Sequence, residues 1–439
     1  MKPIKTTKII QLLMWSFLLV ALGGGMIHLA NRGKMNINIG TVHIPRVDVD
    51  TDVNGIEIQV NTSHMKVAKE ESVQLEGIDF INMKLASADV EVSFVEGSEV
   101  RVVESTNDED EKELFEMSQS GNMLNIIRKE EKSNYYISFG ERPYHKVEVF
   151  IPIRFKEKLA TETSSGDIKL LSNTYLQGLE INTTSGNFNC EKEIEVNKVS
   201  ISSTSGDKEI SQLKSISYEI NASSGELIMS ALKGTGRIES TSGDVRISQI
   251  SGENHEIATS SGDIEVEEGQ GNFTIESTSG YKKIGSLVGS EHFIESSSGD
   301  IDIEELEGNG NIETTSGRVA INTLIEGKID INTSSGSVII KQLEGYGRVS
   351  STAGEIIIDV IQLRGDMMLT TSSGEVDIRA SKDVNANVEV ETSSGDIGGN
   401  IEMNYENKNE NKATSQLGNG KENIIKIETA SGDVVLSQD

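Results

Sequence analysis

The sequence predicts an all-β protein whose larger part is a parallel β-solenoid, and three observations lead to this prediction. A Ser-Gly-Asp tripeptide, or a close variant of it, returns about every 18 to 19 residues from Gly166 onward. Aliphatic residues keep fixed distances from its glycine, and no proline occurs after Pro152. A period this short and regular indicates stacked units that share one continuous core.

The glycines of the repeat set the number of units. They are Gly166, Gly186, Gly206, Gly225, Gly243, Gly262, Gly280, Gly299, Gly317, Gly336, Gly354, Gly374, Gly395 and Gly432. Successive steps are 18 to 21 residues long, except the last, which is 37 residues. We therefore expect fourteen coils, or fifteen if the long step contains another.

Each unit is predicted to hold two short strands. Around Gly262, for example, aliphatic residues stand five residues before and two and four after it, at Ile257, Ile264 and Val266. A spacing of two in β-branched runs indicates strands with one inward face. Ser-Gly-Asp would form one turn, where glycine supplies a positive φ, and Leu-x-Gly, as in Leu306–Gly308, would form the other.

Near-identical residues at equivalent positions predict that the coils stack in register at about 4.8 Å. The absence of proline fits an uninterrupted ladder, because proline cannot donate to it. We expect a single-stranded β-helix with right-handed winding, the usual hand of parallel crossovers.

Residues 9–30 are predicted to anchor the chain in a membrane. This run has few polar interruptions and is long enough to span a bilayer. Lysines in residues 1–8 favour a cytoplasmic amino terminus and place the bulk of the chain outside the cell membrane. A cleaved signal peptide is the alternative, since small residues follow Ala21.

Residues 31–158 have irregular strand-like patterns and are predicted to form a β-rich cap, because an open solenoid end must be covered. The solenoid itself is assigned to residues 159–439. A stretch at 398–420, rich in Asn, Glu and Lys, is expected to protrude as a polar loop.

The composition narrows the classes of partner. A formal net charge of −30 should repel nucleic acid and anionic lipid headgroups. Aromatic residues make up 4 % of the chain, too few for a typical carbohydrate-stacking cleft. Cys190 is the single cysteine, so no intramolecular disulfide can form, and its position predicts a buried thiol.

A column of carboxylates follows the repeat glycines in ten copies, including Asp207, Glu226, Asp244 and Asp263 on four consecutive rungs. Stacked carboxylates repel one another, so a Ca²⁺ ion could be held there. The competing interpretation, which we favour, is that each carboxylate caps its turn. The Gly-Gly-x-Gly-x-Asp motif of calcium-binding rolls is absent from the sequence.

Other motifs give little support for catalysis. The carboxylates recur in ten of the fourteen copies, so their glycosidase-like spacing singles out no pair. His255 and His292 are predicted to lie two coils apart with Phe273 between them, too far to share a metal. Residues 279–282 fit Ser-x-x-Lys, and residues 364–366 spell Arg-Gly-Asp at a predicted exposed turn, but both coincide with repeat positions.

The chain resembles the bacterial putative-adhesin, or toastrack, family of β-strand-repeat envelope proteins. The resemblance rests on Val149–Pro152 leading into Thr163–Ile168, on the repeated Ser-Gly-Asp-Ile/Val, and on the closing segment from Gly418 to Val434. It implies an envelope protein behind a membrane segment, in some relatives linked to envelope stress. It brings no catalytic residues.

We therefore expect a membrane-anchored, extracytoplasmic β-solenoid that acts as a non-catalytic scaffold or adhesin-like binding module, with no cofactor and no small-molecule substrate. Its partner would be another envelope protein or a cell-surface ligand. The alternative is an envelope-stress signalling or sensing protein that contacts another membrane protein.

Overall fold

The computed structural model describes residues 49–52, 55–58, 65–107, 114–129, 144–406, 411–420 and 423–439. The chain divides into two compact units, residues 1–61 with 133–142, and residues 62–132 with 143–439. Strands β1 (Val49–Asp52) and β2 (Gly55–Ile58) form an antiparallel hairpin in the first unit. The other described strands join in one sheet in the second unit.

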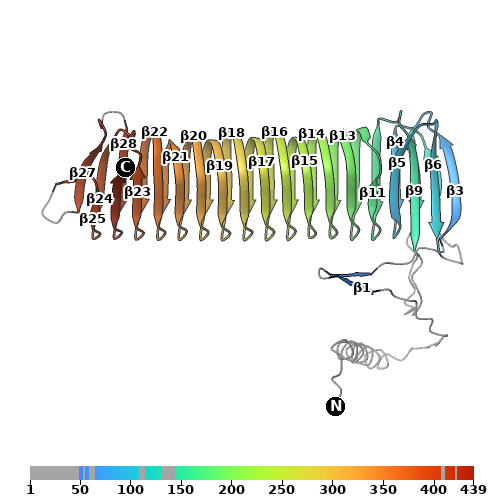
Figure 1. The fold of residues 1–439 in the computed structure, drawn as a ribbon. Helices are drawn as coiled ribbons and strands as arrows, with labels where there is room; N and C mark the ends of the chain where they lie inside the picture. The colour runs from blue at the N-terminus through green and yellow to red at the C-terminus, as the bar shows by residue number, and fades with distance from the viewer. Residues whose placement is uncertain are drawn as a thin grey trace, which may run out of the picture. The chain divides into compact units, whose positions relative to one another are not determined.

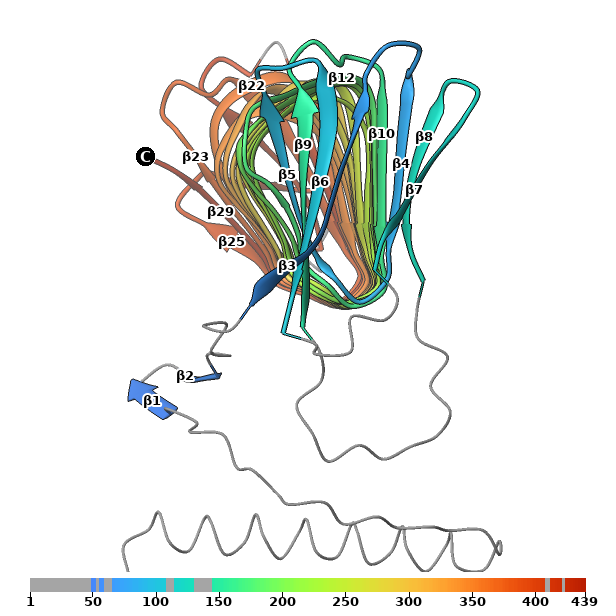
Figure 2. The same cartoon turned by 90° about the vertical axis from the view of Figure 1, so that its right-hand side faces the viewer.

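The second unit is a parallel β-solenoid (Figure 1). Its regular coils each consist of one long strand and a four-residue turn, such as residues 204–207. Seen from the end, successive coils lie behind one another (Figure 2). The long strands are β13 (Phe188–Ser203), β14 (Lys208–Ala222), β15 (Leu227–Ser240), β16 (Val245–Thr259), β17 (Ile264–Ser277), β18 (Lys282–Ser296), β19 (Ile301–Thr314), β20 (Val319–Thr333), β21 (Val338–Ser351) and β22 (Ile356–Thr371).

The prediction of two short strands per coil is wrong in this region. The strand continues through the second corner, where the register of neighbouring strands shifts, for instance between Lys233 and Gly236. Coils of 18 and 19 residues differ by one residue, and the shift at this corner absorbs the difference. The right-handed winding stays a prediction.

Close stacking explains the glycine at each Ser-Gly-Asp turn. A Cβ on Gly299 would lie 2.0 Å from the carbonyl oxygen of Gly280 in the preceding coil. Across the whole column, from Gly166 to Gly395, the corresponding distances are 1.8–2.3 Å. Only Gly206 and Gly225 among these turn glycines have a positive φ. The predicted reason for glycine, a positive φ, is therefore wrong for most turns.

A second glycine column lines the opposite corner. A Cβ on Gly252 would lie 1.9 Å from the Gly234 oxygen, and one on Gly327 would lie 1.8 Å from the Gly308 oxygen. The backbones therefore approach each other at both corners of the coil. This approach allows the hydrogen-bonded ladder to follow the chain around the second corner.

Columns of aliphatic side chains fill the interior. The isoleucines five residues before the turn glycines, such as Ile257, Ile275 and Ile294, are fully buried. The predicted inward position of Cys190 is also confirmed, because the residue is buried. The predicted aliphatic columns thus form one shared core.

A column of buried hydroxyls lies beside the turns. In eleven described turns, the Ser or Thr three residues before the glycine accepts a hydrogen bond from the glycine N–H at 2.8–3.2 Å. Buried polar groups need such partners. The hydroxyls therefore belong to the turn and complete its backbone hydrogen bonding.

At the carboxyl-terminal end, the spatial order of the coils differs from the chain order. Strand β28 (Ile424–Thr429) lies between β22 and β24 (Ala386–Thr392), parallel to both. Strand β29 (Val434–Gln438) lies between β23 (Val376–Ala380) and β25 (Ile397–Gly399). The coil of Gly432 is thus inserted between those of Gly374 and Gly395.

The 37-residue step contains a hairpin, so the alternative of a fifteenth coil is wrong. Within the predicted polar loop, β26 (Asn404–Tyr405) and β27 (Lys412–Leu417) form an antiparallel pair. Strand β27 also pairs antiparallel with β24. It covers an edge that would otherwise expose unpaired backbone groups.

At the amino-terminal end, a coil is likewise inserted out of chain order. Strands β4 (Phe80–Leu85) and β5 (Asp89–Val95) lie between β8 (Met123–Arg128) with β9 (His145–Pro152) on one side and β10 (Lys158–Thr163) with β11 (Ile168–Leu170) on the other. Strand β12 (Thr174–Thr183) continues the stack toward β13. The coils therefore extend beyond the predicted start at residue 159, into the predicted cap.

Antiparallel strands close this end. Strand β7 (Glu116–Ser120) pairs with β8, and β6 (Glu99–Thr106) pairs with β9. Strand β3 (Lys66–Gln74) pairs with β6. A β-rich cap is thus present, although it is interwoven with coils of the solenoid.

The predicted membrane segment 9–30 and the residues before it lie outside the described residues. Within the described part of the chain, no helix has the length and apolar character needed to cross a membrane.

We predict that Gly299→Ala destabilises the protein by about 3 kcal/mol, because overpacking against the Gly280 oxygen forces the coils apart. Urea unfolding followed by circular dichroism measures the change. Gly398→Ala is the matched control, since its Cβ would meet nothing within 4 Å. Equal stability of the two variants would contradict the stacking explanation.

Candidate functional site

The acidic residues after the turn glycines cap the neighbouring coil. Asp244 Oδ1 accepts a hydrogen bond from the backbone N–H of Asp263 at 2.9 Å, and Asp207 Oδ1 accepts one from that of Glu226 at 2.8 Å. Asn187 has the same role toward the Asp207 N–H. The favoured interpretation of a turn cap therefore describes this column, with the difference that each cap reaches the next coil.

Two of the four calcium candidates also contact an arginine. Arg246 forms ion pairs with Glu226 and with Asp244, the latter at 3.2 Å. Asp263 Oδ1 accepts a hydrogen bond from the Tyr281 N–H at 2.8 Å. Among the described residues, no group of three or more His, Cys, Asp or Glu side chains is placed to hold a metal ion.

An aromatic stack interrupts the aliphatic core. The Phe273 ring lies between His255 and His292, with ring centroids 4.8 and 5.9 Å away, as the sequence predicts. The Tyr218 hydroxyl reaches His255 Nδ1 at 2.8 Å across the coil of Gly236. A Cβ on Gly236 would lie 2.8 Å from the Tyr218 ring, so glycine makes room for it.

Burial controls the charge of these histidines. It lowers the pKa of His255 and of His292, which favours the neutral rings. His292 Nε2 lies 3.0 Å from the Glu307 carbonyl oxygen, while its Nδ1 has no hydrogen-bond partner in the described structure. The stack thus packs as part of the core.

Two lysines are buried at a position where most other coils carry Ile or Val. Lys208 Nζ donates to the Gly206 carbonyl oxygen at 2.8 Å, and Lys282 Nζ donates to that of Gly280 at 3.5 Å. Burial lowers the pKa of both ammonium groups to about 8. Lys282 belongs to the Ser-x-x-Lys match, and its hydrogen bond to the turn gives it a structural role there.

Tyr281 and Arg318, which each replace the acidic residue after a turn glycine, both contact the Asp302 carboxylate. The Tyr281 hydroxyl donates to Asp302 Oδ2 at 2.6 Å, and Arg318 Nη2 lies 2.8 and 2.9 Å from the two Asp302 oxygens. These side chains line a shallow cleft of about 630 Å³. The constellation is local, whereas most polar contacts of the solenoid recur from coil to coil.

The Arg-Gly-Asp tripeptide lies within strand β22, so the predicted turn is wrong at this position, whereas Arg364 and Asp366 are exposed as predicted. Arg364 donates to Glu326 Oε1 at 2.7 Å, and Asp366 Oδ1 accepts a hydrogen bond from the Ile424 N–H at 2.9 Å. Both charged ends of the tripeptide are thus held by the solenoid.

A buried charged cluster in the amino-terminal region has no signal in the repeat. Glu104 Oε1 lies 3.1 Å from Arg128 Nε and 2.8 Å from His145 Nδ1, and Glu104 Oε2 accepts the Phe115 N–H. Burial acts to raise the pKa of Glu104, but its hydrogen bonds and the charge of Arg128 outweigh burial and lower it. The cluster joins β6, β8 and β9.

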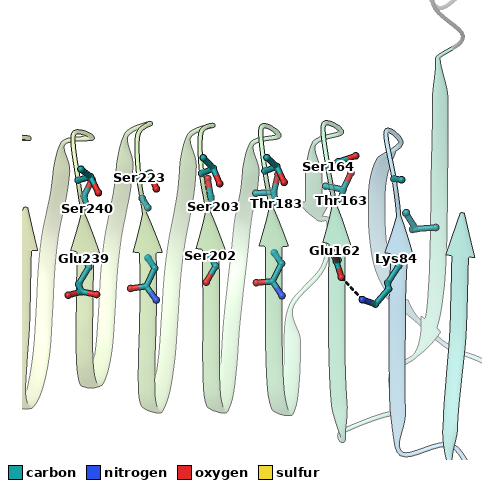
Figure 3. A pocket seen from close by; sticks show the side chains of 18 of the residues that line it. Lys84, Glu162, Thr163, Ser164, Thr183, Ser202, Ser203, Ser223, Glu239 and Ser240 are labelled. Atoms are coloured by element: carbon teal, nitrogen blue, oxygen red, sulfur yellow. Dashed lines mark ion pairs between the residues drawn. The ribbon is translucent and has the colours of Figure 1, made fainter. Parts of the chain in front are cut away.

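A long groove with a volume of about 790 Å³ lies beside the Ser-Gly-Asp turns. It runs across seven coils, from Lys84 on β4 to Ala258 on β16. Figure 3 shows the side chains that follow it, including Glu162, Ser202 and Glu239. This groove was not predicted from the sequence, because its residues look like ordinary outward polar positions on separate coils.

Hydroxyls and amides dominate the groove. Asn182, Ser202 and Asn221 occupy equivalent positions on three successive coils, between Glu162 and Glu239. Lys84 pairs with Glu162 at 2.7 Å, and Arg237 pairs with Glu239, so both flanking carboxylates have a cationic partner.

Beyond Ala258 the same column becomes acidic, with Glu276, Glu295 and Glu313 on consecutive coils. The groove is therefore a nearly neutral strip on an acidic protein. Its hydroxyl and amide groups can both donate and accept hydrogen bonds.

The geometry defines the chain as a capped parallel β-solenoid with a long polar groove. Two stretches, residues 78–281 and 268–437, match the toastrack family DUF4097, and the chain belongs to this family. The resemblance seen in the sequence is thus confirmed. No curated protein is detectably similar to the chain.

Solved structures with similarity to the chain include three bacterial proteins. A putative cell adhesion protein from Clostridium sporogenes is 11 % identical, covers 84 % of this chain and 99 % of its own, and has a TM-score of 0.17. A putative adhesin from Parabacteroides merdae is 13 % identical, with coverages of 66 % and 97 % and a TM-score of 0.27. A putative lipid binding protein from Parabacteroides distasonis is 12 % identical, with coverages of 85 % and 97 % and a TM-score of 0.18.

We predict that the free energy of unfolding contains a pH-dependent contribution from Lys208. At pH 7 the Lys208 amine is charged in both the folded and the unfolded chain. Loss of its hydration in the folded chain lowers the free energy of unfolding. Between pH 8 and 10.5 the folded chain releases this proton while the unfolded chain keeps it, so stability rises with pH by up to about 3 kcal/mol.

Urea unfolding of the wild type and Lys208→Met across this pH range measures the contribution. The variant should be more stable at pH 7, and its stability should rise less with pH than that of the wild type, because only the contribution of Lys282 remains. Lys233→Met, which removes an exposed lysine on the next strand, is the control and should keep the rise of the wild type. Parallel pH curves for wild type and Lys208→Met would contradict the prediction.

Proposed function

We propose that the chain is a non-catalytic binding module of the cell envelope, which holds an extended, uncharged polymer at the cell surface in its turn-side groove. The observation that carries the proposal is the groove itself, a neutral strip across seven coils on a protein with a net charge of −30. Solenoids commonly bind through such long surfaces.

The groove chemistry sets the class of ligand. Asn182, Ser202 and Asn221 offer donors and acceptors at a spacing of about 4.8 Å, which favours a ligand with regularly spaced polar groups. The acidic column beyond Ala258 would repel an anionic polymer. The groove lining contains no aromatic side chain, so hydrogen bonds must supply the specificity.

The position in the cell is also a proposal. Residues 9–30 would cross the cytoplasmic membrane once, with residues 31–439 outside, and this part would present the groove to other envelope components or to a cell-surface ligand. Membership of the toastrack family supports an envelope role without deciding between adhesion and signalling.

Charge introduced into the groove tests the binding proposal. We expect Ser202→Arg with Asn221→Arg to reduce the binding of the labelled full chain, in lipid nanodiscs, to intact cells and isolated cell walls by about tenfold or more, since two lost hydrogen-bond sites and a steric block together exceed 1.4 kcal/mol. Fluorescence of the pelleted cells measures the binding.

The repeat supplies a matched control at equivalent positions outside the groove lining. Asn332→Arg with Ser350→Arg adds the same charge to the same column and should bind like the wild type. Loss of binding in both double variants, or a wild type that binds neither cells nor walls, would overturn the proposal.

Protease accessibility tests the proposed topology. Added protease should digest the chain in cells whose cytoplasmic membrane is intact, once the outer layers are permeable to the enzyme. A cytoplasmic control protein must survive in the same sample. Survival of the solenoid until the membrane is lysed would contradict an extracytoplasmic location.

A further inference from the structure

The coil of β28 and β29 occupies a slot between two other coils. On one edge Ser431 N–H donates to Ser372 O at 3.0 Å, and Asp433 O accepts from the Val376 N–H at 2.9 Å. On the other edge Thr429 O accepts from the Ser393 N–H at 3.2 Å, and the Val434 N–H donates to Asp396 O at 2.9 Å. The segment is thus hydrogen-bonded along both edges.

The same segment fills the core of its slot. Ile425, Ile427, Val434 and Leu436 are buried, at the positions where other coils place their own aliphatic residues. Gly432 fits the glycine column, since its Cβ would lie 1.8 Å from the Gly374 oxygen. Residues 423–439 therefore match the slot in shape, register and polarity.

The connections differ between the two ends of the solenoid. Residues 423–439 follow the other described coils in the sequence, so their release interrupts none of the described coils by breaking its chain connection. The inserted strands β4 and β5 are followed by β8 and β9, which pack on them. The carboxyl-terminal coil is therefore the inserted coil whose release leaves the coils up to β23 paired. Strands β24 and β25 lose their parallel partners and stay joined to the solenoid through residues 381–385.

The slot itself is formed by residues outside the segment. Strands β22 and β23 bound one side, and β24 and β25 bound the other. Residues 381–385 link the two sides directly. In the folded chain these two sides lie about 9.6 Å apart, and release of the segment would leave two parallel strand edges open to any segment with the pattern of the repeat.

We propose that residues 423–439 of one copy can occupy the slot of a second copy, so that the chain associates with itself by exchange of its carboxyl-terminal coil. The exchanged form contains the same hydrogen bonds and buried side chains as the closed form. In the closed form, a short connection keeps residues 423–439 near the slot of their own chain. Their effective concentration there, on the order of millimolar, favours the closed form. Exchange should therefore increase as the local concentration of the protein rises.

Crosslinking between two full-length variants tests the exchange. In a Cys190→Ser background, one chain carries Thr370→Cys and the other carries Glu428→Cys, positions that are register partners across the slot. The two chains are unfolded together in urea, refolded at increasing concentration, and treated with a short bis-maleimide. Only exchange places these two thiols of different chains next to each other.

Two equivalent positions on ordinary coils provide a matched control pair of cysteine variants. Glu276→Cys and Glu295→Cys on separate chains are register partners between two ordinary coils, which exchange does not bring together. A single chain with both Thr370→Cys and Glu428→Cys should crosslink internally, which verifies the register and shows that the slot folds.

We expect the slot pair to give at least about tenfold more crosslinked heterodimer than the matched pair as the protein approaches millimolar concentration. The yield should fall on dilution before refolding. Equal yields from the two pairs, while the double variant crosslinks internally, would overturn the proposal. A double variant that folds but fails to crosslink internally would also overturn it, because the slot register would then be wrong.

Discussion

The close approach of successive backbones at the turns is the constraint on which the rest of the structure depends. With a carbonyl oxygen 1.8–2.3 Å from where each Cβ would lie, only glycine can stand in the column from Gly166 to Gly395. The tight turn places the preceding hydroxyl within reach of the glycine N–H, and it places the following carboxylate over the next coil. The polar column and the groove beside it both follow from this geometry.

Repetition alone cannot end a solenoid, and the two ends show how this chain does so. At each end, the coil next to the outermost one lies out of chain order. Antiparallel strands such as β7 and β27 cover the outermost parallel strands. An antiparallel strand breaks the parallel pattern that a further coil would need. The ends thus hide the edges at which parallel stacking could continue.

Much of the fold could be predicted from the sequence, because the inward columns have a simple period. Ile257, Ile275 and Ile294 recur with the turn glycines, and this recurrence indicates both the strands and their stacking. The single long strand per coil was not predictable, since Leu-x-Gly resembles a turn while its glycine in fact allows close stacking of a continuous strand. The place of β28 was not predictable either, because its pattern fits any slot in the array.

The candidate site was harder to predict than the fold. Residues such as Ser202 and Asn221 look like ordinary polar outward positions, and only the stacked structure shows that they line one groove. The buried Lys208 and the Tyr281–Asp302–Arg318 cluster had a signal, as departures from the repeat, but their contacts depend on neighbouring coils. A departure from the repeat therefore marks a residue with a distinct role, but it does not show which groups that residue contacts.

Pulsed electron paramagnetic resonance between spin labels on equivalent strand positions of different coils tests the stacked architecture most directly. Labels at Glu162, Glu276 and Thr370, in a Cys190→Ser background, should be separated in proportion to the coils between them, at about 4.8 Å per coil. This gives about 29 Å for the first pair, about 24 Å for the second, and about 53 Å between the outer labels. Distances that fail to add along one axis would contradict the account.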